Sequence, residues 1–167
     1  MSGETKRVQN IVLIALYTAL IASVTVFTVV PFGVGGYFNL GDVAVMIVAA
    51  ITPLRHAVFA ASMGSMLADI LSGYAQYAIF TGLIKGFMAY AVFKLLKRLK
   101  GKWVSLAFVV GSLIMLLLYG ATDAFLLGGY PSFIASISVN ATQAVMGSIV
   151  SIGLYPLTLK IREFLKG

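Results

Sequence analysis

The chain alternates between long runs of apolar residues and short segments rich in Gly, Pro, Lys and Arg. A helix needs roughly 20 apolar residues to cross the hydrocarbon layer of a membrane, and most of these runs come close to that length. The run at residues 40–52 is shorter, and Pro53 joins it to the next run through a tight turn. The pattern predicts six transmembrane helices, with approximate spans 8–30, 40–52, 56–72, 74–97, 104–127 and 133–159.

The segments between the runs do not favour a continuing helix. Residues 31–36 combine one Pro with three Gly, Ser72 and Gly73 end the third run, and residues 128–131 read Gly-Gly-Tyr-Pro. Such residues break helices or favour turns. We therefore expect an all-α integral membrane protein, a compact bundle of six transmembrane helices that forms one domain over residues 1–167.

The composition supports the membrane class. Hydrophobic residues make up 60% of the chain and charged residues 10%, and the mean hydropathy is +1.02, far from the usage of a soluble domain. The first run is too long for the apolar core of a cleavable signal peptide, so we interpret it as the first span. The chain has no cysteine, which excludes disulfides, thiolate chemistry and cysteine-based metal sites.

The positive charge has a topological explanation. A net charge of +7 would suit nucleic acid, but the basic residues form short clusters between apolar runs, so no nucleic-acid partner is expected. Short cytoplasmic loops of membrane proteins collect Lys and Arg. With six spans and both termini in the cytoplasm, eleven of the twelve basic residues fall on the cytoplasmic side. The exception is Lys85, inside the fourth span.

Polar residues within this fourth span recur at helical spacing. Tyr77, Thr81 and Lys85 are four residues apart, which puts them on one face of a helix, and Tyr74 extends that face. Lys85 lies eleven residues beyond Tyr74, or roughly 16 Å deeper at the α-helical rise, near the middle of the membrane. A buried ammonium group at that depth needs a partner.

Two further spans carry similar pairs. Tyr119 and Asp123 are four residues apart in the fifth span, and Asn140 and Gln143 are three apart in the sixth. Three helices can therefore direct polar groups toward one volume. The predicted substrate-binding residues are Tyr37, Asn39, Asp42, Asp69, Tyr74, Tyr77, Thr81, Lys85, Tyr119, Asp123, Asn140 and Gln143.

The aspartates and amides also have simpler interpretations. Asp42, Asp69 and Asp123 fall near the outer ends of the second, third and fifth spans, and a carboxylate there can anchor a helix end near the lipid headgroups. Asn140 and Gln143 can serve as hydrogen bonds between helices. Lys85 suits a structural pair with one of the aspartates as well as a direct contact with substrate, and the sequence does not say which aspartate would pair with it.

Two loop and helix features complete the pattern. The segment Tyr37-Phe38-Asn39 in the first outer loop is either a connector or a lid that stacks on a flat ligand. Ala15 and Ala19 form a small-xxx-small pair on the first helix, which permits another helix to approach closely, inside the bundle or outside it.

Together these features resemble the substrate-binding S component of energy-coupling factor (ECF) vitamin transporters, in particular the branch assigned to hydroxymethylpyrimidine or pyridoxine. The resemblance spans the whole chain and depends on the order and spacing of individually loose motifs. These motifs are the six-span layout, Ala15-x-x-x-Ala19, Tyr37-Phe38-Asn39-Leu40-Gly41-Asp42 after a Gly-rich segment, Ala68-Asp69-x-x-x-Gly73-Tyr74 and Lys85-Gly86.

The resemblance implies a subunit that captures a vitamin or precursor from outside the cell while its loops close over the ligand. It also implies that Ala15 and Ala19 dock against a transmembrane coupling (T) subunit, which works with two cytoplasmic ATPases in a prokaryotic plasma membrane. The chain has no phosphate-binding Gly-x-x-x-x-Gly-Lys-Ser/Thr loop, so ATP hydrolysis would belong to the partners. No cofactor and no metal are expected. Riboflavin is an alternative ligand on the same scaffold.

Two other classes of function are less consistent with the sequence. An enzyme would need a nucleophile, a metal cluster or an acid–base pair, but the single His is predicted at the cytoplasmic turn and the aspartates are spread over three helices. A channel would need polar residues through the full thickness of the membrane. Long apolar stretches at 43–51 and 106–118 instead favour a blind pocket open to the outside.

Overall fold

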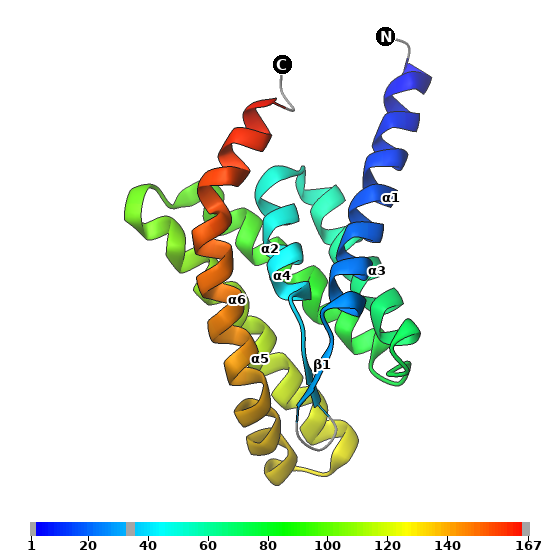
Figure 1. Ribbon diagram of the computed structural model, residues 1–167, viewed down its shortest axis with the longest axis vertical. Helices are drawn as coiled ribbons and strands as arrows, with labels where there is room; N and C mark the ends of the chain where they lie inside the picture. Colours follow the sequence, from blue (N-terminus) through cyan, green and yellow to red (C-terminus); the bar gives the residue numbers. More distant parts are fainter. Residues whose placement is uncertain (1–2, 33–35, 165–167) are drawn as a thin grey trace.

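The computed structural model describes residues 3–32 and 36–164, with side chains for residues 3–30 and 39–164. These residues form six α-helices, one short 3-10 helix and one two-stranded hairpin (Figure 1). In chain order the elements are α1 (Gly3–Phe27), β1 (Val30–Phe32), β2 (Gly36–Phe38), α2 (Gly41–Ile51), α3 (Leu54–Leu71), α4 (Ala78–Arg98), η1 (Gly101–Val104), α5 (Ser105–Leu127) and α6 (Tyr130–Phe164).

The predicted helical bundle is confirmed, and its helices pack in pairs. α1 packs on α3, α3 on α4, and α5 on α6, with α2 at the centre against α1, α4 and α6. Apolar side chains from these helices form the core, including Met46 of α2, Met88 of α4 and Phe108 of α5, all without solvent exposure. The outer faces carry many exposed apolar residues, which is expected when the surrounding solvent is lipid.

Two helices differ from the predicted membrane spans, since α2 is too short to cross a membrane alone and α6 is longer than predicted. α1, α4, η1 with α5, and α6 are long and apolar enough to cross a membrane. α2 has 11 residues and would extend only about 16 Å at the α-helical rise, so it is too short to cross alone. α6 is longer than predicted at both ends, since it continues to Phe164 and since Tyr130 and Pro131 belong to its first turn rather than to the preceding turn. Proline is tolerated there since the first N–H groups of a helix have no partner in the helix.

The first outer segment is also different from the predicted loop. β1 and β2 form an antiparallel pair in which Val30 faces Phe38 and Phe32 faces Gly36. The hairpin runs down between α1 and α6 and returns to the middle of the bundle, where α2 begins (Figure 1). The start of α2 is thereby placed well inside the molecule, and this position decides the chemistry of the site.

The two ends of the helical bundle differ in the connections and the basic residues that they carry. The beginning of α1, the α2–α3 and α4–α5 connections and the end of α6 lie toward one end, while the hairpin and the α3–α4 and α5–α6 connections lie toward the other (Figure 1). Lys6, Arg55, Arg98, Lys102 and Arg162 belong to the first of these ends. The basic residues thus gather at one end of the bundle, with Lys85 as the exception among the residues described.

Candidate ligand-binding site

A cavity of about 210 Å³ lies among α1, α3, α4, α5, α6 and the segment that leads into α2. Ten of the twelve predicted binding residues line it, and they come from five separate parts of the chain. These ten are Asn39, Asp69, Tyr74, Tyr77, Thr81, Lys85, Tyr119, Asp123, Asn140 and Gln143. Of the other two, the Tyr37 side chain lies outside the described residues, and Asp42 lies behind the wall rather than in it.

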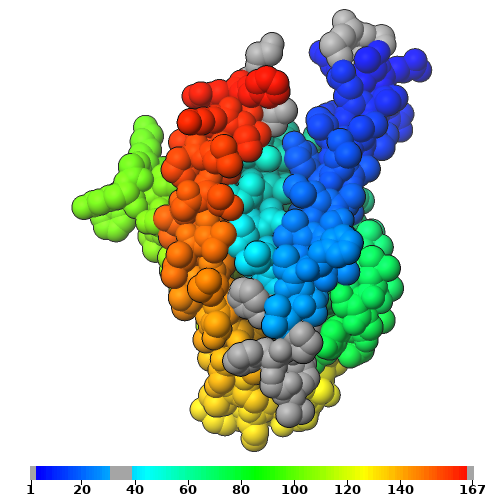
Figure 2. Space-filling view, in the orientation of Figure 1, coloured from blue at the N-terminus to red at the C-terminus, as the bar shows by residue number. Residues whose placement is uncertain are grey.

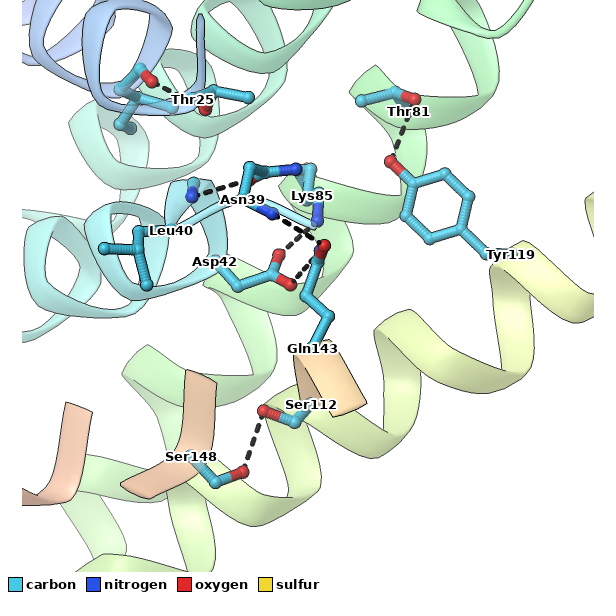
Figure 3. Close-up of polar contacts among 12 residues, drawn as sticks. Thr25, Asn39, Leu40, Asp42, Thr81, Lys85, Ser112, Tyr119, Gln143 and Ser148 are labelled. Atoms are coloured by element: carbon cyan, nitrogen blue, oxygen red, sulfur yellow. Dashed lines mark hydrogen bonds and ion pairs between the residues drawn. The ribbon is translucent and has the colours of Figure 1, made fainter. Parts of the chain in front are cut away.

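Asp42 joins three helices beneath the cavity. Its carboxylate is 1% exposed and pairs through Oδ1 with the Lys85 ammonium group of α4. Its Oδ2 accepts a hydrogen bond of 2.7 Å from Nε2 of Gln143 on α6 (Figure 3). Asp42 also lies in the first turn of α2, where the helix dipole favours a negative charge. Asp42 is therefore the aspartate that pairs with Lys85.

This position differs from the sequence-based placement of Asp42 near the outer end of a span. The hairpin occupies the outer part of the path, so α2 starts in the interior and carries Asp42 with it. Only there can a residue at the start of α2 meet Lys85, which is itself seven residues into α4. The depth of Asp42 follows from the hairpin, which the hydrophobic pattern did not predict.

The same amide of Gln143 holds the segment that enters α2. Its Oε1 accepts a hydrogen bond of 3.2 Å from the backbone N–H of Asn39, and the Asn39 side chain accepts one of 2.7 Å from the N–H of Gly41. A Cβ atom at Gly41 would collide with the Thr25 side chain of α1, so this close approach requires glycine. Gln143 thus ties the exit of the hairpin to α6 and to the ion pair.

Tyr119 of α5 contacts two polar residues of α4. Its hydroxyl donates a hydrogen bond of 2.9 Å to Thr81 Oγ1, and the Lys85 ammonium group lies 5.1 Å from the centre of its ring. An ammonium group over an aromatic face is attracted to the ring electrons. Lys85 is therefore enclosed by Asp42 on one side and by Tyr119 on another.

Gly73 explains why Asp69 and Tyr74 come together. Gly73 adopts a positive φ of 86°, which ends α3, and the Tyr74 N–H then returns to the Asp69 carbonyl at 2.8 Å while the Gly73 N–H bonds the Ile70 carbonyl at 3.3 Å. This is the Schellman arrangement that commonly closes a helix C-terminus. The prediction that Tyr74 belongs to the fourth helix is wrong, because α4 begins at Ala78 and Tyr74 precedes it.

Several cavity-lining hydroxyls were not among the residues predicted from the sequence. Ser132 and Ser136 precede Asn140 on the same face of α6, and Thr25 and Ser65 contribute from α1 and α3. The spacing 132, 136, 140, 143 is helical and was a usable signal. It is weak, however, because Ser and Thr can bond a carbonyl of their own helix, as Thr25 does to Ile21 at 2.7 Å, and so occur on any face of a membrane helix.

Within residues 3–32 and 36–164, no three His, Asp or Glu side chains gather closely enough to share a metal ion. The polar groups around the cavity are hydroxyls, amides, aromatic rings, carboxylates and the Lys85 ammonium group. Such groups recognise the polar edges and the flat face of a small organic molecule. The arrangement is suited to reversible binding.

Residues 5–161 match the family described as the ECF-type riboflavin transporter, S component. The chain belongs to this family. The S component is 35% identical over 133 residues to a protein of Pyrococcus woesei that is described as uncharacterized, covering 78% of this chain and 88% of the relative. It is 27% identical over 156 residues to the thiamine precursor transporter HmpT of Lactococcus lactis, covering 92% of this chain and 90% of the relative.

The family confirms the resemblance inferred from the sequence, and it makes this S component a multi-pass membrane protein of a transporter rather than an enzyme. The ligands in the two descriptions differ, since the family is described by riboflavin and the Lactococcus relative by a thiamine precursor. Membership therefore gives the type of protein but leaves the ligand to the chemistry of the cavity.

Proposed function

We propose that this S component captures a small vitamin or vitamin precursor, hydroxymethylpyrimidine or a pyridoxine-like ring, from outside the cell for ATP-driven uptake. The observation that carries the proposal is the size and lining of the cavity. At about 210 Å³ it is smaller than the roughly 300 to 1,000 Å³ typical of pockets for drug-sized ligands. A single aromatic ring with polar substituents suits this space better than the three fused rings and sugar-like chain of riboflavin, which is the second candidate because of the family description.

The topology that we propose has six crossings with both termini in the cytoplasm, in one domain. The basic end of the bundle would then be cytoplasmic, as the preference of Lys and Arg for cytoplasmic loops requires. The hairpin and the 11 residues of α2 would complete one crossing together. Backbone outside a helix is tolerated at membrane depth where it is enclosed by protein or lines a cavity, and Asn39 and Gly41 at this junction do line the cavity.

Copurified ligand tests the function. We expect native mass spectrometry of the purified S component to show a bound small molecule at near-stoichiometric amount, and hydroxymethylpyrimidine or pyridoxine to raise its thermal stability. Asn140→Ala, which removes a cavity-lining amide, should weaken that binding by about 5- to 150-fold. Stabilisation by riboflavin alone would favour the second candidate. An empty protein that gains no stability from any vitamin, or that conducts ions by itself, would favour a structural or channel role.

The proposed partners are a transmembrane T subunit and two cytoplasmic ATPase subunits. Ala15 and Ala19 are both exposed, whereas α1 packs on α3 through the face that carries Thr18 and Ile21. The beginning of α1 stands apart from the end of α6, and the surface is hollowed between them over α2 (Figure 2). A small-residue face directed away from the bundle favours docking over internal packing as the role of these alanines.

Tryptophan substitutions test the docking face. We expect Ala15→Trp with Ala19→Trp to abolish assembly with coexpressed T and ATPase subunits, because two bulky side chains keep the helices apart, while ligand binding stays unchanged. Ala121→Trp, at an exposed position of α5, is the matched control and should assemble normally. Loss of ligand binding or of folding in the α1 variant would instead assign this face to internal packing.

A further inference from the structure

The fixed nitrogen donors around the cavity are engaged within the protein. Lys85 pairs with Asp42 and lies over the Tyr119 ring. Gln143 donates to Asp42 through Nε2 at 2.7 Å. Asn140 donates through Nδ2 to the carbonyl and the hydroxyl of Ser136, at 3.0 and 3.2 Å. Each of these three side chains therefore directs at least one N–H group to a partner inside the protein.

Asp123 and Asn140 each present an acceptor at the cavity. The Oδ1 atom of Asp123 is shielded from solvent and has no hydrogen-bond partner among the described residues, while the carboxylate lies beside the Tyr77 hydroxyl. Asn140 donates to Ser136 through its nitrogen, while its carbonyl oxygen accepts no hydrogen bond from those residues. Both residues line the cavity. The hydroxyls of Tyr77 and Ser132 can donate or accept, so they do not set a preference.

The charges of the cavity-lining side chains also favour a ligand that donates hydrogen bonds over an anionic ligand. The positive charge of Lys85 is compensated by Asp42, so it is not available to neutralise an anionic ligand. Asp123 presents a carboxylate to the same cavity. A buried acceptor without a partner is costly, and a donor on the ligand would remove that cost. A phosphate or carboxylate on the ligand would instead face a charge of its own sign, which is an effective way to reject a competitor.

We propose that Asp123, with the Asn140 carbonyl, makes this cavity selective for an aromatic heterocycle that donates hydrogen bonds through an amino or protonated ring nitrogen. The same groups exclude phosphorylated or carboxylated forms of that ring. Asp123 is thus the residue that determines specificity, and Lys85 is a positioning residue for Asp42 rather than an anion-binding group. This inference rests on the proposed function, since it describes the ligand of the same cavity.

Matched ligands test the selectivity of the unmodified protein. The probes are 4-amino-5-hydroxymethyl-2-methylpyrimidine, its monophosphate and the analogue with a 4-oxo group in place of the amine, titrated into the full chain in detergent by calorimetry. We expect the amine to bind about 10- to 100-fold more tightly than the oxo analogue, the range of one hydrogen bond to a charged group. The monophosphate should bind at least about 100-fold more weakly than its parent, because repulsion adds to the desolvation of the phosphate.

Two variants identify the residue responsible. Asp123→Asn should reduce the ratio between amine and oxo analogue to near one, because an amide can either donate or accept, and it should reduce discrimination against the monophosphate. Glu163→Gln removes a carboxylate at an exposed position near the end of α6 and should leave every affinity unchanged. Unchanged ratios in Asp123→Asn, or a monophosphate that binds the unmodified protein as tightly as its parent, would overturn the inference.

A second pair of ligands distinguishes failure of this inference from failure of the proposed function. Riboflavin and its 5′-phosphate differ by the same added charge. If only riboflavin binds and its phosphate is rejected, the proposed ligand is wrong while the anion exclusion stands. If the pyrimidines bind without preference, the proposed ligand stands and the selectivity is overturned. If no probe binds, both are overturned.

Discussion

Lys85→Met is expected to destabilise the bundle by about 3 to 5 kcal/mol, the usual cost of removing one member of a buried ion pair. Methionine is unbranched and about as long as lysine, but it has no charge. The substitution leaves the Asp42 carboxylate, 1% exposed, with a hydrogen bond from Gln143 and no compensating cation. Chemical or thermal unfolding in detergent measures the loss. Lys94→Met, at an exposed position of the same helix, should cost no more than about 0.5 kcal/mol.

A double variant shows whether the unpaired charge of Asp42 causes the loss of stability in Lys85→Met. Asp42→Asn combined with Lys85→Met removes both charges but keeps an acceptor for the Gln143 amide. Because neighbouring residues in one network are not additive, the double variant should recover at least about half of the stability lost in Lys85→Met. Equal stability of Lys85→Met and Lys94→Met, or a double variant as unstable as the sum of its single variants, would mean that the pair contributes little.

Gly64→Leu is expected to have the second largest effect, a loss of about 3 kcal/mol, at the upper end of what overpacking costs. A Cβ atom at Gly64 on α3 would lie 2.8 Å from the Thr18 carbonyl oxygen and 2.9 Å from Ile21 Cβ on α1. The first neighbour is backbone, so the helices must separate to accommodate any side chain. Because α1 carries the proposed docking face, we also expect weaker assembly with the T subunit.

Gly153 supplies the control for this substitution. It is an exposed glycine within α6, and nothing lies within 4 Å of the position that its Cβ would occupy. Gly153→Leu gains helix propensity without a clash, so it should be neutral or stabilising. The two variants thus share the same chemical change but have opposite expected signs in thermal unfolding. A Gly64→Leu protein as stable as Gly153→Leu would show that α1 and α3 do not need this close contact.

The local pattern of the sequence was sufficient for much of the helical framework. The predicted range 104–127 agrees with Ser105–Leu127 of α5, and 40–52 with Gly41–Ile51 of α2. The predicted helix boundaries are wrong where a Pro or Gly can either form a turn or lie at the end of a helix. Pro131 was assigned to a turn but begins a helix, and Gly73 ends α3 with a positive φ so that Tyr74 is not yet helical.

The Asp42–Lys85 ion pair separates what the local sequence can predict from what depends on tertiary structure. The depth of Lys85 in an apolar run was enough to predict that it needs a partner. The identity of the partner depends on the position of the α2 start, 43 residues earlier in the chain. That position follows from the pairing of β1 with β2 and from the hydrogen bond that Gln143 of α6 accepts from Asn39.

The sequence by itself determined the membrane class, the approximate helices and the residues that carry polar chemistry, because hydropathy and helical period are properties of neighbouring residues. Only the tertiary structure decided that Asp42 pairs with Lys85 behind the cavity wall, while Oδ1 of Asp123 has no hydrogen-bond partner within the described part of the chain. Both aspartates lie in apolar runs and have the same side chain. Their surroundings differ because contacts between distant segments, made as α4 and α6 pack against α2, satisfy the Asp42 carboxylate, while no such contact reaches Oδ1 of Asp123 from the described residues.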